Sequence, residues 1–489
     1  MTPLRQSWIL GAFLVVNAAL LLGAVPGAAY VHGGDAALYA GPAMALWRDG
    51  VLSTSLSDPT PLSFAPPLYP VFLAPLLGPL PFDAALAVVV CLQTTMLWLT
   101  GVAARDLLPQ DAAGPRDLLQ ALVAFNPNAL FTAHLVQAET LFALLATLAM
   151  AAIVEWMRAP SARVASWVGL LVGLSALARP VGLFAVPLLP LLLPVLALLA
   201  APGQRRLRAL VPQAMLATAV ATALVAPWFA RNAAVFGQPF FTTNAGFYLS
   251  DQYVELLQVS TGMPGAEASA LRYERIAAAS RASGNEDLDA LPAPARSAFT
   301  AAAVVPLLLE QPASAWGHAL ARSWANLFAG GGASNAKNLL GLEGSGAAEL
   351  LSSHRWDGPV AFARQFFSQP GTAYLLLVVM TAAFAVLARL AGVIGIARML
   401  LAREYAMAAL LVGEVAFFTA SYVFLGQSRF RVPIEPALMA LAAWAIASPG
   451  RAQPSRLSAV PVPQRERPRA AHAATRTRSS TCVESSSGV

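Results

Sequence analysis

Long apolar runs dominate this 489-residue sequence and constrain its fold more than any other feature. A helix that crosses a bilayer needs about 20 mostly apolar residues. Charged residues make up only 11% of the chain, against about 25% in an ordinary soluble domain. We therefore expect an all-α polytopic membrane protein with about 10 transmembrane helices, at Trp8–Val25, Asp83–Ala104, Leu118–Ala133, Ala138–Trp156, Val164–Ala178, Val181–Ala200, Leu210–Phe229, Thr372–Ala391, Tyr405–Leu425 and Val432–Ala447.

Arginines mark alternate connections between these runs and indicate the topology. Cytoplasmic connections of membrane proteins carry an excess of Lys and Arg. With both termini inside, two long connections, residues 26–82 and 230–371, lie outside. We therefore expect a multi-pass protein of the cell inner (cytoplasmic) membrane, in contact with membrane lipid, whose active site faces the periplasm or exterior. The arginines on the cytoplasmic side are then Arg5, Arg105, Arg116, Arg158, Arg163, Arg205, Arg206, Arg208, Arg398 and Arg403.

The net charge of +6 is concentrated at the C-terminal end of the chain. Residues 449–489 contain seven arginines and two glutamates, a net +5, which leaves +1 for the rest. A segment rich in Pro, Ser, Thr and Arg cannot bury enough apolar surface to fold. We expect a membrane domain over 1–448 and a disordered, basic cytoplasmic tail over 449–489, either simply solvated or attracted to anionic lipid. Nucleic acid is not an expected partner.

Common catalytic and metal-binding signatures are missing from the sequence. It contains no Walker phosphate loop, no dinucleotide glycine fingerprint and no HExxH motif. The two cysteines, Cys91 and Cys482, cannot build a disulfide scaffold or a cysteine-based zinc site. No cofactor is predicted with certainty, and dependence on a divalent metal stays open. The candidate functional residues are acids and arginines near the predicted outer face.

The stretch Gly33–Gly50, GGDAALYAGPAMALWRDG, is the most informative for function. We expect Asp35 to begin a short helix after two glycines, with Tyr39 one turn later on the same face. Aspartate is also a preferred N-cap residue, so a purely structural role for Asp35 fits the spacing equally well. Asp49 and Asp58 fit solvated turn residues better.

Five further stretches accompany Gly33–Gly50, and together they resemble one superfamily. They are APPLYPVFLAPLLG (Ala65–Gly78), NPNALFTAHLVQAETLFALLATLA (Asn126–Ala149), LARPVGLFAVPLLPLL (Leu177–Leu192), APWFARNAAVFGQPFFTTNAGFYL (Ala226–Leu249) and RFRVPIEPALMALAAW (Arg429–Trp444). In this order they resemble the GT-C glycosyltransferases, particularly dolichyl-phosphate-mannose–protein mannosyltransferases and the bacterial aminoarabinose transferases of lipid A. The resemblance implies a GT-C-like membrane domain over residues 1–448, with helices in its outer loops.

The resemblance implies an enzyme that moves a hexosyl or pentosyl group from a polyprenyl-phosphate donor to a lipid, glycan or protein acceptor. It also implies that Asp35 is the catalytic carboxylate. A phosphate leaves without a general acid, so one carboxylate could deprotonate the acceptor hydroxyl in a single inverting displacement. Many members carry two adjacent acids, whereas Ala36 follows Asp35 here. Glu139, an acid within an apolar run, is the better candidate for a second catalytic acid and Asp58 the weaker one. An interfacial glutamate bonded to a neighbouring helix describes Glu139 equally well.

Such a lipid phosphate needs cations at the level of the outer headgroups. Arginine suits this task because its planar fork gives two hydrogen bonds to phosphate oxygens. Arginines at predicted outer span ends either bind phosphate or extend toward lipid headgroups. His134, near Glu139, is either a substrate-binding residue or a hydrogen-bonded interface histidine. The predicted substrate-binding residues are Tyr39, His134, Arg179, Arg231, Arg429 and Arg431.

Two other classes of protein fit the composition. A polytopic transporter or lipid flippase for a cell-envelope glycolipid is the main alternative. Such proteins often contain internal repeats, and the sequence shows no similarity between its halves. A non-catalytic membrane assembly factor is the other, and it would tolerate the loss of Asp35, whereas a transferase would not.

Overall fold

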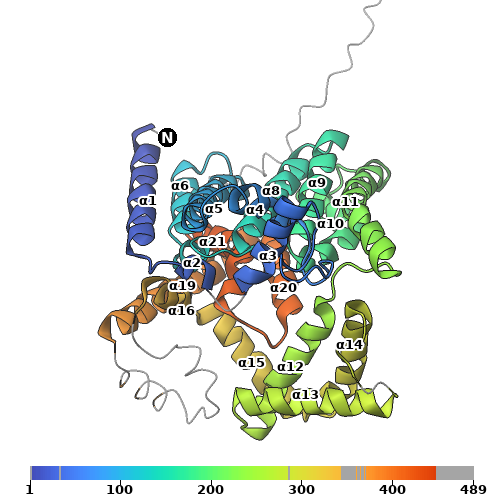
Figure 1. Cartoon of the computed structure of the whole chain (residues 1–489). Coiled ribbons are helices and arrows are strands. Elements are labelled where there is room, and N and C mark those ends of the chain that lie inside the picture. Colours follow the sequence, from blue (N-terminus) through green and yellow to red (C-terminus); the bar gives the residue numbers. More distant parts are fainter. Residues whose placement is uncertain are drawn as a thin grey trace, which may run out of the picture.

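The computed structural model describes residues 3–31, 35–284, 287–342 and 371–447, with the single positions 360, 364 and 368. The predicted tail and most of 343–370 lie outside the described residues. Within the described part, β-pairing is limited to an isolated bridge between Ser53 and Pro61. The rest is built from helices (Figure 1): α1 (Pro3–Gly23), α2 (Ala28–Val31), α3 (Asp35–Asp49), α4 (Leu68–Leu77), α5 (Phe82–Ala104), η2 (Arg105–Leu107), α6 (Ala113–Ala124), α7 (Pro127–Ala133), α8 (Glu139–Arg158), α9 (Ala162–Ala178), η3 (Pro180–Leu188), α10 (Leu189–Ala200), α11 (Leu207–Phe236), α12 (Asn244–Thr261), α13 (Gly265–Ala282), α14 (Ala293–Leu309), α15 (Ala313–Ala329), α16 (Ala333–Leu340), α19 (Thr372–Leu401), α20 (Tyr405–Tyr422), η4 (Ser428–Ile434) and α21 (Glu435–Trp444).

The described helices confirm the predicted all-α, multi-pass class but not the predicted number of spans. Seven helical spans are long and apolar enough to cross a membrane, or eight if the bent pair α14 and α15 forms one span. The expected count of about 10 is therefore not confirmed. The seven are α1, α5 with η2, α8, η3 with α10, α11, α19 and α20.

Breaks and short helices account for the three remaining apolar runs. The run Leu118–Ala133 is split where Pro127 begins α7 and the side chain of Asn126 caps that helix. The run Val432–Ala447 begins inside η4, where Pro433 lacks the backbone N–H that a continuous α-helix would use. The third run forms α9, which has only 17 residues. Each run is helical, but none is one uninterrupted span of full length.

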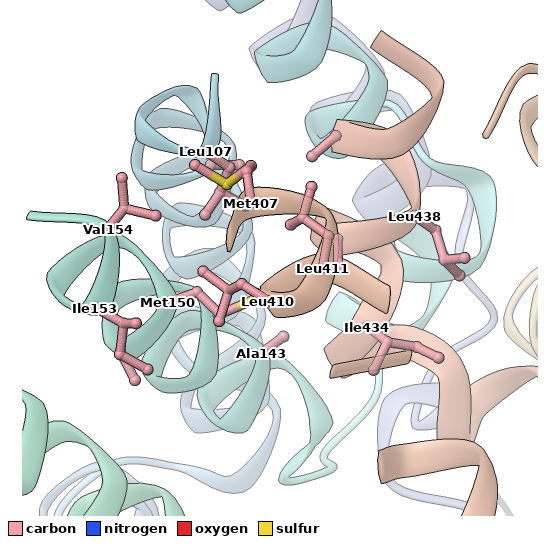
Figure 2. Packing of buried hydrophobic residues seen from close by; sticks show 14 of the residues in the cluster. Leu107, Ala143, Met150, Ile153, Val154, Met407, Leu410, Leu411, Ile434 and Leu438 are labelled. Carbon is pink, nitrogen blue, oxygen red and sulfur yellow. The ribbon is translucent and has the colours of Figure 1, made fainter. Parts of the chain in front are cut away.

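The helices share an extended apolar core to which α8, α20 and α21 all contribute. Figure 2 shows side chains of α8, α20 and η4 close together within it, among them Met150, Leu410, Leu411 and Ile434. Lipid tails are as apolar as these side chains, so van der Waals packing holds the helices together more than removal from water does. Close packing is therefore the condition for a stable bundle.

A lobe of four helices, α12 to α15, lies beside the bundle and packs around its own apolar core (Figure 1). Three hydrogen bonds from two side chains tie the lobe to the end of α20 and to the segment that leads to η4. The Gln252 side chain donates to the carbonyl of Tyr422 at 3.1 Å and accepts the N–H of Phe424 at 2.8 Å. The Ser323 hydroxyl accepts the N–H of Gly426 at 2.8 Å. The lobe therefore fixes the backbone that leads into η4.

Glycines allow pairs of helices to approach through their backbones. A Cβ atom at Gly395 of α19 would overlap the carbonyl oxygen of Leu441 on α21. One at Gly169 of α9 would overlap the carbonyl oxygen of Ala217 on α11. A backbone oxygen cannot rotate away as a side chain can. Glycine is therefore required where these helices cross.

We expect Gly395→Ala to destabilise the bundle by about 1–3 kcal/mol, because the added methyl forces α19 away from α21. Gly413→Ala on α20 is the matched control, since a Cβ there meets nothing within 4 Å. Thermal unfolding of the detergent-purified variants, followed by intrinsic fluorescence, measures the difference. Equal midpoints for the two variants would show that α19 and α21 are not in backbone contact.

Candidate functional site

Asp35 is the first residue of α3, where the sequence predicted that a helix begins. This helix buries Ala36, Ala40 and Ala43 in a small core that it shares with α4. The spacing of these alanines places one face of α3 against its neighbour. The carboxylate of Asp35 remains 30% exposed and forms an ion pair with Arg429. An anion therefore stands at the start of the helix, in reach of solvent.

Arg429 reaches Asp35 from the other end of the chain. It is the second residue of η4, and its Nη1 donates to the Asp35 carboxylate. Its Nε donates to the side-chain oxygen of Gln427 at 3.0 Å. The Asn128 side chain holds the preceding carbonyl, that of Ser428, at 2.6 Å. The hydrogen bonds at Nε and at the preceding carbonyl thus orient the guanidinium toward Asp35.

Glu139 and Arg179 form a second ion pair next to the first. Their side chains are only 4% and 8% exposed. Glu139 interacts electrostatically with Arg429 as well as with Arg179, so the two pairs are neighbours. Removing two charges from water is costly unless each is matched, so neither partner can be lost cheaply. Asp58, the weaker candidate for a second acid, lies in an exposed turn and accepts the N–H of Thr60 at 3.0 Å.

Aromatic side chains lie around the two ion pairs. The rings of Tyr422 and Phe430 stack with centroids 4.5 Å apart and planes 2° apart. The guanidinium carbons of Arg429 and Arg179 lie 4.9 and 5.8 Å from the centroid of the Phe430 ring. Both distances are in the range of cation–π attraction. Phe430 therefore links the exposed pair to the buried pair.

Tyr39 interacts electrostatically with both pairs, through Asp35, Glu139 and Arg179. Burial raises the pKa of its phenol above the usual value. The phenol consequently stays protonated near neutral pH and can donate a hydrogen bond. Its ring meets that of Tyr69 edge-on, with centroids 5.0 Å apart. Tyr39 therefore lies beside both ion pairs, and its role in substrate binding stays a prediction.

Arg231 lies apart from these ion pairs, on α11. It donates to the carbonyl of Leu62 at 2.6 Å and to that of Leu52 at 3.1 Å. A third bond runs to the side-chain oxygen of Asn232 at 2.8 Å, and the guanidinium lies 4.8 Å from the centroid of the Trp228 ring. These contacts fasten the loop between α3 and α4 to α11.

Two further predicted residues contact groups outside these ion pairs. Arg431 is 1% exposed, pairs with Glu435 and donates to the carbonyls of Leu327 and Gly330. His134 is also 1% exposed, and its Nδ1 lies 2.9 Å from the carbonyl oxygen of the residue four positions earlier. The structure therefore brings Asp35, Tyr39, Glu139, Arg179 and Arg429 together, but it gives these two residues other partners.

The arrangement combines two kinds of chemistry without a net charge. A partly exposed carboxylate can accept the proton of a hydroxyl group. A guanidinium can bind phosphate oxygens through its fork. Among the described residues, no group of three or more His, Cys, Asp or Glu side chains is placed to hold a metal ion.

Sequence reasoning missed three aromatic residues of the site: Tyr248, Tyr422 and Phe430. Tyr248 and Tyr422 interact electrostatically with Arg179, which places them beside the buried pair. Phe430 lies between two arginines that had been predicted to bind phosphate, so its position was a usable signal. The tyrosines offered none, because their proximity depends on how α12 and α20 pack.

No protein-family model and no curated protein sequence matches the chain. Among solved structures, the archaeal oligosaccharyltransferase AglB from Archaeoglobus fulgidus, in complex with an inhibitory peptide and a dolichol-phosphate, is 15% identical with a TM-score of 0.47. That similarity covers 91% of this chain and 50% of AglB, so the chain spans half of the archaeal protein's length. ArnT from Cupriavidus metallidurans matches in its apo state (14% identity) and bound to undecaprenyl phosphate (15%), each with a TM-score of 0.37, over 90% of this chain and 78% of ArnT. Both are GT-C-fold glycosyltransferases, as the sequence resemblance predicted, but likenesses at this level assign no role to any residue.

We expect Glu139→Gln to destabilise the protein by about 3–5 kcal/mol, because it leaves the Arg179 charge buried without a partner. The double variant Glu139→Gln/Arg179→Gln should recover part of that loss. Asp49→Asn is the control, since the Arg48–Asp49 pair is exposed and its loss should not be measurable. Denaturant unfolding in micelles gives the comparison. A double variant no more stable than Glu139→Gln alone would contradict the coupling.

We expect Arg231→Ala to free the loop over residues 52–62, so that proteases cut it several times faster. The lipid-phosphate binding expected from the sequence should not depend on Arg231, because its guanidinium is occupied by loop carbonyls. Arg208→Ala, at the exposed start of α11, serves as the control. Loss of lipid-phosphate binding with an intact loop would instead support the phosphate-binding role expected from the sequence.

Proposed function

We propose that the chain is a membrane glycosyltransferase that moves a sugar from a polyprenyl-phosphate donor to a hydroxyl group of a lipid, glycan or protein acceptor. The observation that carries this proposal is the ion pair between Asp35 and Arg429. These residues lie 394 positions apart in the chain, yet they meet as a partly exposed carboxylate and a partly exposed guanidinium. One suits an acceptor hydroxyl, and the other suits a donor phosphate.

Asp35 acts as the catalytic base in this proposal. The acceptor oxygen attacks the anomeric carbon, the bond from that carbon to the phosphate oxygen breaks, and Asp35 takes the hydroxyl proton. The configuration at the anomeric carbon inverts because a single displacement occurs. The departing phosphate keeps the electron pair of the broken bond and needs no proton from the enzyme.

Arg429 binds the phosphate of the donor in this proposal. Its fork can give two parallel hydrogen bonds, and the charge stabilises the phosphate as it leaves. The buried Glu139–Arg179 pair lies next to Asp35 and Arg429 and sets the electrostatic potential around them. Tyr39, with its phenol held neutral, donates a hydrogen bond to the substrate.

We assign this end of the bundle to the periplasm or exterior. The arginine-rich connections include the α8–α9, α10–α11 and α19–α20 links, at the opposite ends of those helices from the Asp35 site. Excess positive charge marks the cytoplasmic side of a membrane protein. No nucleotide sugar is available on the periplasmic or exterior side, which agrees with a lipid-borne donor.

Asp35→Asn should lower the transfer rate by about 100-fold or more, because the amide cannot accept the proton. The assay uses purified protein in nanodiscs with radiolabelled polyprenyl-phosphate sugars and extracted membrane lipids or cell-wall glycans as acceptors. Asp49→Asn, which removes the same charge from the other end of α3, should keep wild-type transfer. Equal rates for wild type and Asp35→Asn would refute the assignment of the base.

A further inference from the structure

The two ion pairs of the site differ in their exposure to solvent. The side chains of Asp35 and Arg429 are 30% and 20% exposed, whereas those of Glu139 and Arg179 are 4% and 8% exposed. A buried pair can separate only if a charge is left without a partner at low dielectric. A partly exposed pair separates at a smaller cost, because water can solvate the separated charges. Of the two pairs, the Asp35–Arg429 pair can therefore exchange partners more readily.

Two hydrogen bonds hold Arg429 in position next to its contact with Asp35. Its Nε is bound to Gln427, and the carbonyl before it is held by Asn128. Among the described residues, Asp35 is the acid that pairs with its guanidinium. These two bonds can persist while Nη1 of the guanidinium takes a new partner. A phosphate that approaches from solvent would meet this guanidinium before it met Arg179.

The closed pair restricts Asp35 as a base. One of its two carboxylate oxygens, Oδ2, accepts the Arg429 N–H, and the adjacent positive charge holds the carboxylate in place. An acceptor hydroxyl needs to come within hydrogen-bonding distance of a carboxylate oxygen that is free to accept its proton. The pair that marks the site therefore also limits access to its base.

We propose that the donor phosphate displaces Asp35 from Arg429 and thereby uncovers the base, so that the donor binds before the acceptor. This inference rests on the proposed function. Arg429 exchanges one anion for another, and the released carboxylate remains beside the bound phosphate. The acceptor hydroxyl then finds a free base only in a site that already holds a donor. An empty enzyme keeps both groups neutralised.

Binding of undecaprenyl phosphate to the full-length protein in nanodiscs tests this exchange, because it needs no sugar and no turnover. Asp35 competes with the lipid phosphate for Arg429, so Asp35→Asn should tighten binding by about three- to tenfold. Arg429→Gln should weaken it. In the double variant, Asp35→Asn should no longer tighten binding, because the cation for which it competed is gone. Asp49→Asn controls for the general loss of a negative charge on α3.

Three outcomes would overturn the exchange. Binding by Asp35→Asn equal to or weaker than that of wild type would show that Asp35 does not compete. Tightening that persists in the Arg429→Gln background, or appears equally in Asp49→Asn, would reveal simple charge repulsion. Asp35→Ala provides a second variant if the amide lowers the melting temperature. Loss of transfer in Asp35→Asn with unchanged lipid affinity refutes the exchange alone, whereas tighter binding with wild-type transfer refutes the proposed base alone.

Discussion

Ion pairing between arginine and carboxylate inside an apolar bundle organises this molecule. Glu435 at the start of α21 receives Arg431 from η4 and Arg389 from α19, the latter at 3.0 Å. Glu139 receives Arg179 in the same way. Because an unmatched charge at such depth is costly, the Arg389–Glu435 and Arg179–Glu139 pairs tie together separate helices, and the Arg431–Glu435 pair fixes the junction of η4 and α21. The exposed pair at Asp35 follows the same rule, but at a place where solvent and substrate can compete for it.

The lobe contributes to this site through the backbone. Val423 adopts a φ of 37°, a conformation that a β-branched residue rarely takes and that costs of the order of 1–3 kcal/mol. Gln252 of α12 bonds the peptide groups on both sides of it, at Tyr422 and Phe424. These bonds offset the strain and fix where the chain leaves α20. The direction of η4, and with it the position of Arg429, thus depends on a helix outside the bundle.

Sequence patterns predicted the helices and the charged residues of the site better than the aromatic residues around them. Apolar runs located the helices, and the spacing after the first run located Asp35 as the start of α3. The same reasoning grouped Arg231 and Arg431 with Arg429, since all three lie at apparent span ends. The Arg431–Glu435 pair has a spacing of four residues, a local signal that this reasoning did not use. The loop carbonyls that occupy Arg231 give no such signal in the sequence. Partners separated by more than one hundred residues are set by packing, which local periodicity does not contain.

Proline-marked breaks offer a signal that periodicity alone did not use. Asn126–Pro127 precedes the corner that carries Glu139, Arg179–Pro180 opens η3, and Pro433 lies in η4 with Arg429. A broken helix leaves backbone groups unpaired, and at membrane depth this is tolerated only where protein or a water-filled cavity covers them. Covering the unpaired backbone groups of three breaks at one shared place costs less free energy than covering them at three separate places. Their convergence around the ion pairs explains why polar side chains from distant parts of the chain meet there, and why the site lies where the spans are interrupted.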